Sequence, residues 1–349
     1  MPTLARHYCT RYLVHFIATL AILLAFVLIV ELLLDLDEIL AEQSTPIGIL
    51  QFVTIRITAF YLVHLIPLAS FIGAYLTTAL AARDHEIIAM KAGGISPFTL
   101  TRAVLTGTLV VTFAGLFANE TIVRSAQENL QSDSGDTIGS LSLRHGRIWY
   151  HTGLYVYNIE TLDSSGVRGV RMYKRDLSGR LEQSIQADRG QQVENQLWSF
   201  ENATVRNFDP IQPRTPPTIR KADRIEVRLD PQASPANIRT KLLLEPLSTL
   251  LASPGRDDPI IRANIHRRIS EVPLILGLTL LAVPLGLSVQ KGRSLAKPAL
   301  EGALTISVFF AFREYAGELS MLGQGVGILW GSLATLFIYA GFRLLKSDR

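Results

Sequence analysis

Residues 12–34 read YLVHFIATLAILLAFVLIVELLL, and Glu31 is the only acidic residue in this stretch. A helix of this length crosses a bilayer core of about 30 Å. Only helices and closed barrels satisfy every backbone hydrogen bond in lipid. Five further apolar segments follow, at residues 49–82, 98–120, 269–289, 299–317 and 325–345. The sequence therefore predicts a membrane α-helical bundle of six transmembrane helices, three in each cluster.

The two apolar clusters are separated by mostly polar residues. Hydrophobic residues make up 48% of the 349-residue chain, which is high for a soluble protein and low for a chain buried entirely in lipid. We expect an N-terminal transmembrane half (1–120), an inserted domain (121–262) and a C-terminal transmembrane half (263–349). The first segment lacks a small-residue cleavage site, so we expect a retained helix and not a signal peptide.

Lysine and arginine are concentrated on one side of the predicted membrane, and cytoplasmic loops are enriched in these residues. The opposite short loops, 35–48 and 318–323, contain none. Both termini are therefore expected in the cytoplasm, and the inserted domain is expected in the periplasm of a bacterial inner-membrane protein. The basic residues that support this orientation are Arg6, Arg11, Arg83, Lys91, Arg102, Lys291, Arg293, Lys297, Arg343, Lys346 and Arg349.

The inserted domain alternates apolar and polar residues in short runs separated by turn residues such as Ser178-Gly179 and Asp209-Pro210. This pattern predicts strands, and several in succession suggest an all-β sandwich, jelly roll or open barrel. The runs are 147–150, 154–159, 167–175, 181–187, 191–193, 198–208 and 225–229. Leucines in residues 240–253 suggest a short amphipathic segment before the chain returns to the membrane.

Several kinds of catalytic site are missing from the sequence. It contains no GxxxxGK[ST], HExxH, CxxC or GxSxG motif. The single cysteine, Cys9, excludes an intramolecular disulfide. The formal net charge of +4 is small and is divided between loops, so it gives no reason to expect nucleic-acid binding. We expect no catalytic residue, no metal and no cofactor bound by this chain.

The predicted cytoplasmic loop 83–97 carries a more specific signal. Residues 84–92 are typical of a short amphipathic helix, which Gly93-Gly94 ends, and Ser96-Pro97 begins the next helix. A plain turn needs fewer residues and would leave the apolar side chains of Ile87, Ile88 and Met90 exposed. A docking helix for a cytoplasmic partner explains them better; its candidate contact residues are Asp84, Glu86, Ile87, Met90, Gly93 and Gly94.

Basic residues also gather at the predicted outer boundary of the membrane. Charges at this depth are costly unless they are paired or face a cavity. Two interpretations remain: internal ion pairs, such as Arg268 with Glu271, or contacts with an anionic lipid headgroup. The candidate headgroup residues are Arg56, Arg124, Arg267, Arg268 and Arg313.

Three glycines near the last segment are spaced four residues apart: Gly323, Gly327 and Gly331. This small-xxx-small spacing favours helix packing over a nucleotide loop, because no strand precedes it. His15 and His64 lie within spans and are more typical of packed polar contacts than of a proton relay. Glu301 has Lys297 as a possible i,i+4 partner.

The chain resembles the lipopolysaccharide export permease family, the paired F and G subunits of the Lpt system, both in several motifs and in the order in which they occur. The resemblance covers nearly the whole length. It lies in the three-plus-three layout and in residues 86–96, 187–190, 197–202, 265–273, 284–286 and 291–294. Ser270 favours the F-like branch.

The resemblance implies a periplasmic jelly-roll domain, a heterodimer with a paralogous permease subunit, and a cytoplasmic ABC ATPase dimer that holds ATP and Mg²⁺. It implies that lipopolysaccharide is extracted from the outer leaflet of the inner membrane and passed to a periplasmic bridge protein with a jelly roll. It also places the family's coupling helix at residues 84–94, with Glu86 at the ATPase contact.

One departure concerns the outer end of the first span. Some members carry basic residues there, whereas this chain has Glu31, Asp35, Asp37 and Glu38. Phosphate binding would then need other residues, the partner subunit, a bridging cation or a different lipid. Two other functions are alternatives to a permease. A membrane-anchored sensor or assembly factor would need an output domain, and an intramembrane enzyme acting on lipid would need clustered catalytic groups; the sequence shows neither.

Overall fold

The computed structural model describes residues 2–34, 45–126, 140–144, 147–163, 166–176, 178–194, 197–209, 215–228, 238, 242–253, 258–289, 296–321 and 326–348. The chain forms two compact units. The helical unit contains Met1–Gln127 and His266–Arg349, and the β unit contains Glu128–Ile265. The predicted boundaries at 120 and 262 fall inside helical segments, because helix continues through residue 126 and the helix after the β strands begins at Pro259.

Membrane helices are confirmed in the described residues. Five of those helices are long and apolar enough to cross a bilayer. The helices of the chain before the β strands are α1 (Pro2–Leu34), α3 (Pro46–Phe60), α4 (Leu62–Arg83), α5 (Glu86–Ala92), α6 (Phe98–Ala118) and the short π-helix η1 (Asn119–Val123). Those after the β strands are α9 (Leu247–Ala252), α10 (Pro259–Leu287), α11 (Ala296–Met321) and α12 (Val326–Asp348).

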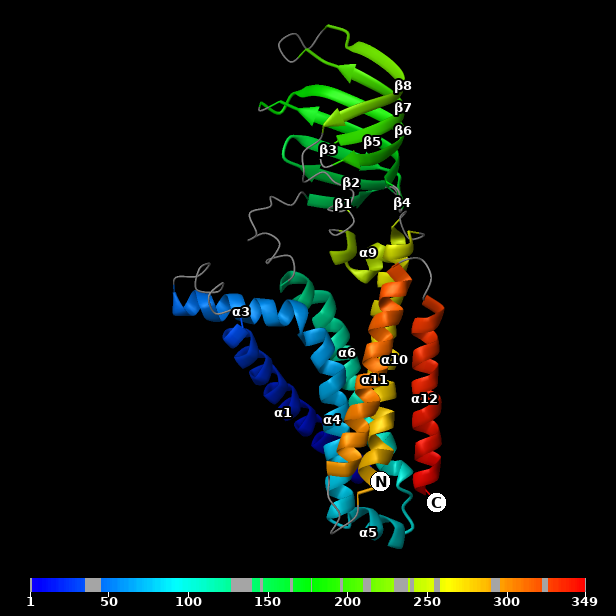
Figure 1. The fold of residues 1–349 in the computed structure, drawn as a ribbon. Helices are drawn as coiled ribbons and strands as arrows, with labels where there is room; N and C mark the ends of the chain where they lie inside the picture. Colours follow the sequence, from blue (N-terminus) through cyan, green and yellow to red (C-terminus); the bar gives the residue numbers. More distant parts are fainter. Residues whose placement is uncertain are drawn as a thin grey trace. The chain divides into compact units, whose positions relative to one another are not determined.

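The predicted second span, 49–82, is wrong as a single helix. The chain turns at Tyr61, and α3 lies across the end of α4 (Figure 1). A straight helix of that length would measure about 50 Å, well beyond the apolar thickness of a bilayer. The second crossing is therefore α4, and α3, with 15 residues, is too short to cross upright.

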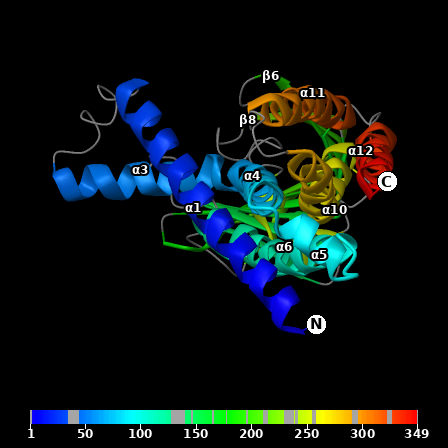
Figure 2. The same cartoon turned by 90° about the horizontal axis from the view of Figure 1, so that it is seen from below.

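The predicted fifth span is α11, which has 26 residues. It is absent from the five apolar candidates among the described helices, and charged residues lie near both of its ends. Two of those charges are paired, since Arg343 of α12 contacts Glu301 at 2.8 Å and Arg313 contacts Glu271 of α10 at 2.7 Å. In both views α11 lies beside α10 and α12 (Figures 1 and 2).

Close packing of the helical unit depends on small residues where helices cross. A Cβ on Gly73 of α4 would meet the backbone nitrogen of Phe16 in α1 at 2.9 Å. A Cβ on Gly286 of α10 would overlap the hydroxyl of Thr78 in α4. Such approaches are typical of membrane helices, because contact between backbones replaces the hydrophobic effect. The core of the unit is made by α1, α4, α6 and α10, with contributions from α11 and α12.

The predicted all-β insertion is confirmed. Its strands are β1 (Ser140–Arg144), β2 (Arg147–Thr152), β3 (Tyr155–Ile159), β4 (Thr161–Asp163), β5 (Gly166–Arg175), β6 (Leu181–Glu194), β7 (Leu197–Asn207) and β8 (Thr218–Arg228). They form one antiparallel sheet in the order β1-β2-β3-β5-β6-β7-β8, with β4 beside β5. The likeness to a jelly roll lies in the curvature of this sheet (Figure 1), since the strand order is that of a meander.

A row of buried residues crosses the inner face of the sheet. Tyr150 pairs with Tyr157, Tyr157 with Met172, Met172 with Ile185, and Ile185 with Val205. The hydrophobic core also includes Ile238, Leu242, Leu250, Ile261 and Ile265, so the predicted amphipathic segment 240–253 covers part of this face. The sheet core is therefore continuous and apolar across five strands.

Candidate functional site

At one end of the helical unit, α5 lies across the bundle, and both chain termini lie at the same end (Figure 1). The helix begins after His85, whose φ of 61° is left-handed. It ends where the Gly94 amide donates to Lys91 and the Ile95 amide donates to Met90 at 2.8 Å. This pattern is a Schellman motif, and Gly94 occupies its left-handed position with φ 72°.

The apolar side chains of α5 divide between the chain's own core and solvent. Met90 is buried and Ile87 is half-buried, whereas Ile88 is 61% exposed. The expectation that all three leave an exposed apolar surface is therefore wrong for Met90, which packs against the Tyr8 hydroxyl at 3.6 Å. Asp84, Gly93 and Gly94 are exposed beside Ile88.

Glu86 is bound by two residues of α1. The Tyr8 hydroxyl donates to Oε2 at 2.7 Å, and the Arg11 guanidinium donates to Oε1 at 2.9 Å. Burial alone would raise the pKa of Glu86, but these hydrogen bonds, with the charges of Arg11 and His7, outweigh it and lower the pKa. Asp84 lies 3.8 Å from Arg11 and is a weaker partner. The sequence did not predict this attachment.

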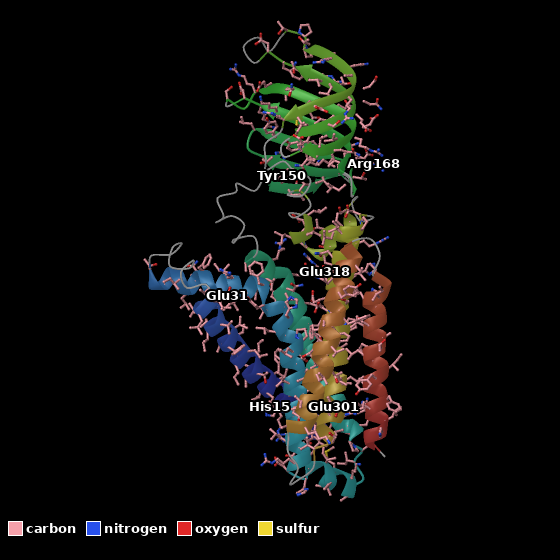
Figure 3. The ribbon with its side chains drawn as sticks, in the orientation of Figure 1. His15, Glu31, Tyr150, Arg168, Glu301 and Glu318 are labelled. Carbon is pink, nitrogen blue, oxygen red and sulfur yellow. The ribbon has the colours of Figure 1, made fainter. Side chains whose placement is uncertain are left out.

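At the outer boundary, Arg56, Arg268 and Arg313 form ion pairs with acidic residues. Arg56 Nε lies 2.6 Å from Glu31, Arg268 lies 3.3 Å from Glu120, and Arg313 lies 2.7 Å from Glu271. Glu31 is 4% exposed and also accepts from the Tyr61 hydroxyl at 3.0 Å. Figure 3 shows Glu31 near the junction of α1 and α3. The internal pair proposed between Arg268 and Glu271 is wrong, because each residue pairs with another helix.

Two candidate arginines remain. Arg124 is half-buried and close enough to Arg268 for their charges to interact. Arg267 is exposed and lines a small cavity with Arg313, Glu314 and His64. Of the five candidate arginines, Arg267 is the one whose side chain is exposed. The acidic positions Asp35, Asp37 and Glu38 lie outside the described residues.

The glycines of α12 make no close contact with a described helix. A Cβ on Gly327 or Gly331 would meet nothing within 4 Å, and Gly323 lies outside the described residues. The predicted packing is therefore not made inside the described part of the chain. Gly331 instead lines an apolar groove of about 620 Å³ between α11 and α12, with Phe309 and Phe312 on its other side.

The family model of the lipopolysaccharide export system permease LptF/LptG matches residues 6–346. The chain belongs to the LptF/LptG family. No curated protein matches the chain.

Membership in the LptF/LptG family makes this chain an inner-membrane, multi-pass permease subunit for lipopolysaccharide export, and a transporter component without catalysis of its own. Two of the segments in which the resemblance lies contain glycines with clear packing roles. Gly190 admits the ring of Phe200, whose Cε1 would lie 2.8 Å from an added Cβ. Gly286 allows α10 to approach α4. In the described residues no group of three His, Cys, Asp or Glu side chains could hold a metal.

Proposed function

We propose that this chain is one permease subunit of an ATP-driven lipopolysaccharide exporter, paired with a paralogous subunit and driven through α5 by a cytoplasmic ABC ATPase dimer. The observation that carries the proposal is α5, a short helix closed by a Schellman motif, which presents exposed Ile88 at the end of the bundle that holds both termini. ATP and Mg²⁺ belong to the ATPase. Both termini and α5 would face the cytoplasm.

The lipid chamber would form between two such subunits. The outer half of α1 and the faces of α11 and α12 expose large apolar side chains, including Phe26, Val308 and Phe342. Acyl chains could lie against these faces while Arg267 contacts a phosphate. Lifting each methylene out of an apolar setting costs about 0.8 kcal/mol, so upward movement needs the energy of ATP.

The β unit would receive the acyl chains on its apolar inner face and pass them to a bridge protein. Strand β8 ends the described sheet and is exposed over most of its length. An edge strand of this kind can pair with an edge strand of another sheet. The continuous path would then reduce the apolar area that meets water during transfer.

Coupling to the ATPase through α5 is tested by purifying the complex with the ATPase and then measuring nucleotide-dependent release of lipopolysaccharide from proteoliposomes. Ile88→Asp should reduce ATPase recovery about tenfold, because it places a charge in an apolar contact. Val193→Asp, at a similarly exposed β6 position (49%), is the control and should have no effect. Full ATPase binding and normal release with Ile88→Asp would contradict the proposal.

The test of the transfer step is a photo-crosslinking residue at Ile219 of β8, which is 57% exposed. It should capture a periplasmic β protein in cells that export lipopolysaccharide. The same residue at Val193 should not. Equal capture at both positions would argue against edge pairing.

A further inference from the structure

The helix α1 contacts the rest of the helical unit at three separate levels. At its inner end, Tyr8 and Arg11 bind Glu86 of α5. Both carboxylate oxygens of Glu86 accept hydrogen bonds: Oε1 from Arg11, and Oε2 from Tyr8 and, at 3.1 Å, from Arg11. Charge-assisted hydrogen bonds of this kind are the strong ones. These side-chain bonds join α5 directly to the inner end of α1.

The second level is a tight crossing in the middle of the bundle. The ring of Tyr12 lies against Gly107 of α6, and the backbone of Phe16 lies against Gly73 of α4. Tyr12 is fully buried, and its hydroxyl lies 2.7 Å from Ser70, which lies 2.9 Å from Thr279 of α10. These pivot contacts, Tyr12–Gly107 and Phe16–Gly73, are the places where α1 lies too close to α6 and α4 for a larger side chain to fit between the helices.

At the third level, α1 contacts α3 and leaves the bundle. Figures 1 and 2 show α1 slanting away from α4 toward α3. Leu24, Leu28 and neighbouring residues of α1 pack on Val53 and Ile57 of α3. The pair Glu31–Arg56, at 2.6 Å, closes this contact. Other side chains of the outer half are exposed, such as Leu33 at 77%.

We infer that Glu86 is a positioning residue: it couples α5 to α1, so that α1 and α3 tilt together about the pivot contacts when α5 is displaced. The inference rests on the proposed function only in assuming that the ATPase displaces α5. At 1.5 Å per residue, Arg11 lies about 8 Å from Phe16 and Leu33 lies about 25 Å beyond it. A displacement at Glu86 is therefore enlarged about threefold at Leu33 by this geometry.

This assignment separates two roles within residues 84–92. The side chain of Glu86 faces its own chain, with 34% of it exposed, whereas that of Asp84 is 56% exposed. Ile88 and Asp84 remain available to the ATPase, while Glu86 acts on α1. A residue that only contacted the ATPase would not depend on what occupies position 11.

The test is a charge exchange between Glu86 and Arg11 in the full complex with its ATPase in proteoliposomes. Glu86→Arg and Arg11→Glu should each reduce nucleotide-dependent lipopolysaccharide release about tenfold, a loss equivalent to one strong interaction. The double variant should recover release to within about threefold, because the ion pair is restored with opposite polarity. Glu182→Arg, which reverses one charge of the exposed Lys174–Glu182 pair, is the matched control.

A distance measurement reports the tilt directly. In a Cys9→Ser background, spin labels at Leu33→Cys and Ile338→Cys of α12 should show a nucleotide-dependent change in separation. Arg11→Glu should abolish the change, and the double exchange should restore it. Tyr8→Phe removes only the hydroxyl that donates to Glu86 and should reduce the change partly. It tests the same contact without reversing a charge, so a failure of the charge variants to fold would not decide the result.

The outcomes separate this inference from the proposed function. If the unaltered chain does not bind an ATPase, the proposed function fails. If it binds and the change in separation persists in Arg11→Glu, the inference alone is wrong. If the double exchange is as defective as Glu86→Arg while Arg11→Glu is normal, Glu86 acts on the ATPase and not on α1.

Discussion

At the scale of single residues, the partners of charged side chains are set by helix crossings. Glu86 was placed in the docking segment from the sequence, but its partners Tyr8 and Arg11 lie more than 70 residues away. Glu271 pairs with Arg313 and not with its near neighbour Arg268. Local spacing identified the charged residues; the crossing geometry that pairs them is a property of the packed bundle.

The buried pair between Glu31 and Arg56 yields a stability prediction. Glu31→Gln leaves a guanidinium that is 24% exposed without its carboxylate, and breaking a buried pair costs about 3–5 kcal/mol. Because Arg56 is partly solvated, we expect a loss of about 1–3 kcal/mol. Thermal unfolding in detergent should show it, whereas Glu182→Gln, at an exposed pair, should change stability by less than about 0.5 kcal/mol. Equal effects would show that burial of Glu31 is unimportant.

The lowered pKa of Glu86 gives a pH prediction. A carboxylate with a lower pKa in the folded state stabilises the fold above its unfolded pKa, 4.5, and this stabilisation is lost as pH falls through the folded value. His7, Tyr8, Arg11 and Asp84 are the groups that surround it. Amide protection of α5 should therefore decrease on acidification below pH 4.5, and Glu86→Gln should remove that decrease. A pH-independent protection factor in the unaltered chain would contradict the assignment.

At the scale of elements, ends marked by turn chemistry were predictable. Gly93-Gly94 ends α5 as expected, and Ser96 Oγ accepts from the Phe98 amide at 3.2 Å. The break at Tyr61 was not predictable, since no glycine or proline occupies that position. Strand β6 continues through the two runs 181–187 and 191–193, and β8 begins seven residues before its predicted start because its charged residues obscure the alternation.

The two glycines that end α5 should respond differently to alanine. Gly94→Ala places a Cβ at φ 72°, which costs about 1–2 kcal/mol. Gly93→Ala meets only ordinary contacts at 3.4 Å and beyond. Hydrogen exchange at the Ile95 amide should therefore accelerate about 5- to 30-fold in Gly94→Ala and change little in Gly93→Ala. The opposite order would exclude the Schellman geometry.

At the scale of the whole molecule, the lengths of the apolar segments and the alternating runs between the two clusters predicted the helical and β units. The exposure of individual helices could not be predicted from the sequence, because every span is apolar whether it faces lipid, a partner or the core. Leu33 of α1 and Leu278 of α10 illustrate this: one is 77% exposed and the other is fully buried. Only packing separates them.

The proposed orientation predicts the result of limited proteolysis. Protease added to intact spheroplasts should cut the β unit and leave both chain ends intact, because the ends would lie behind the membrane. Epitope tags at the two termini report protection, and permeabilised cells provide the positive control. If protease removed the tags earlier than it cut the β unit, the opposite orientation would be correct.

The charged residues of α11 affect how many membrane crossings are counted from the sequence. A survey by hydropathy alone finds five candidates and misses this helix, so its parity would place the two chain ends on opposite faces of the bilayer. In Figure 1 they lie at the same end of the helical unit. Under the proposed orientation α11 is a further crossing, and its charged residues, which pair with α10 and α12 near each of its ends, are what hide it from a hydropathy count. Relatives with a similarly charged fifth span would have their topology inverted by the same count.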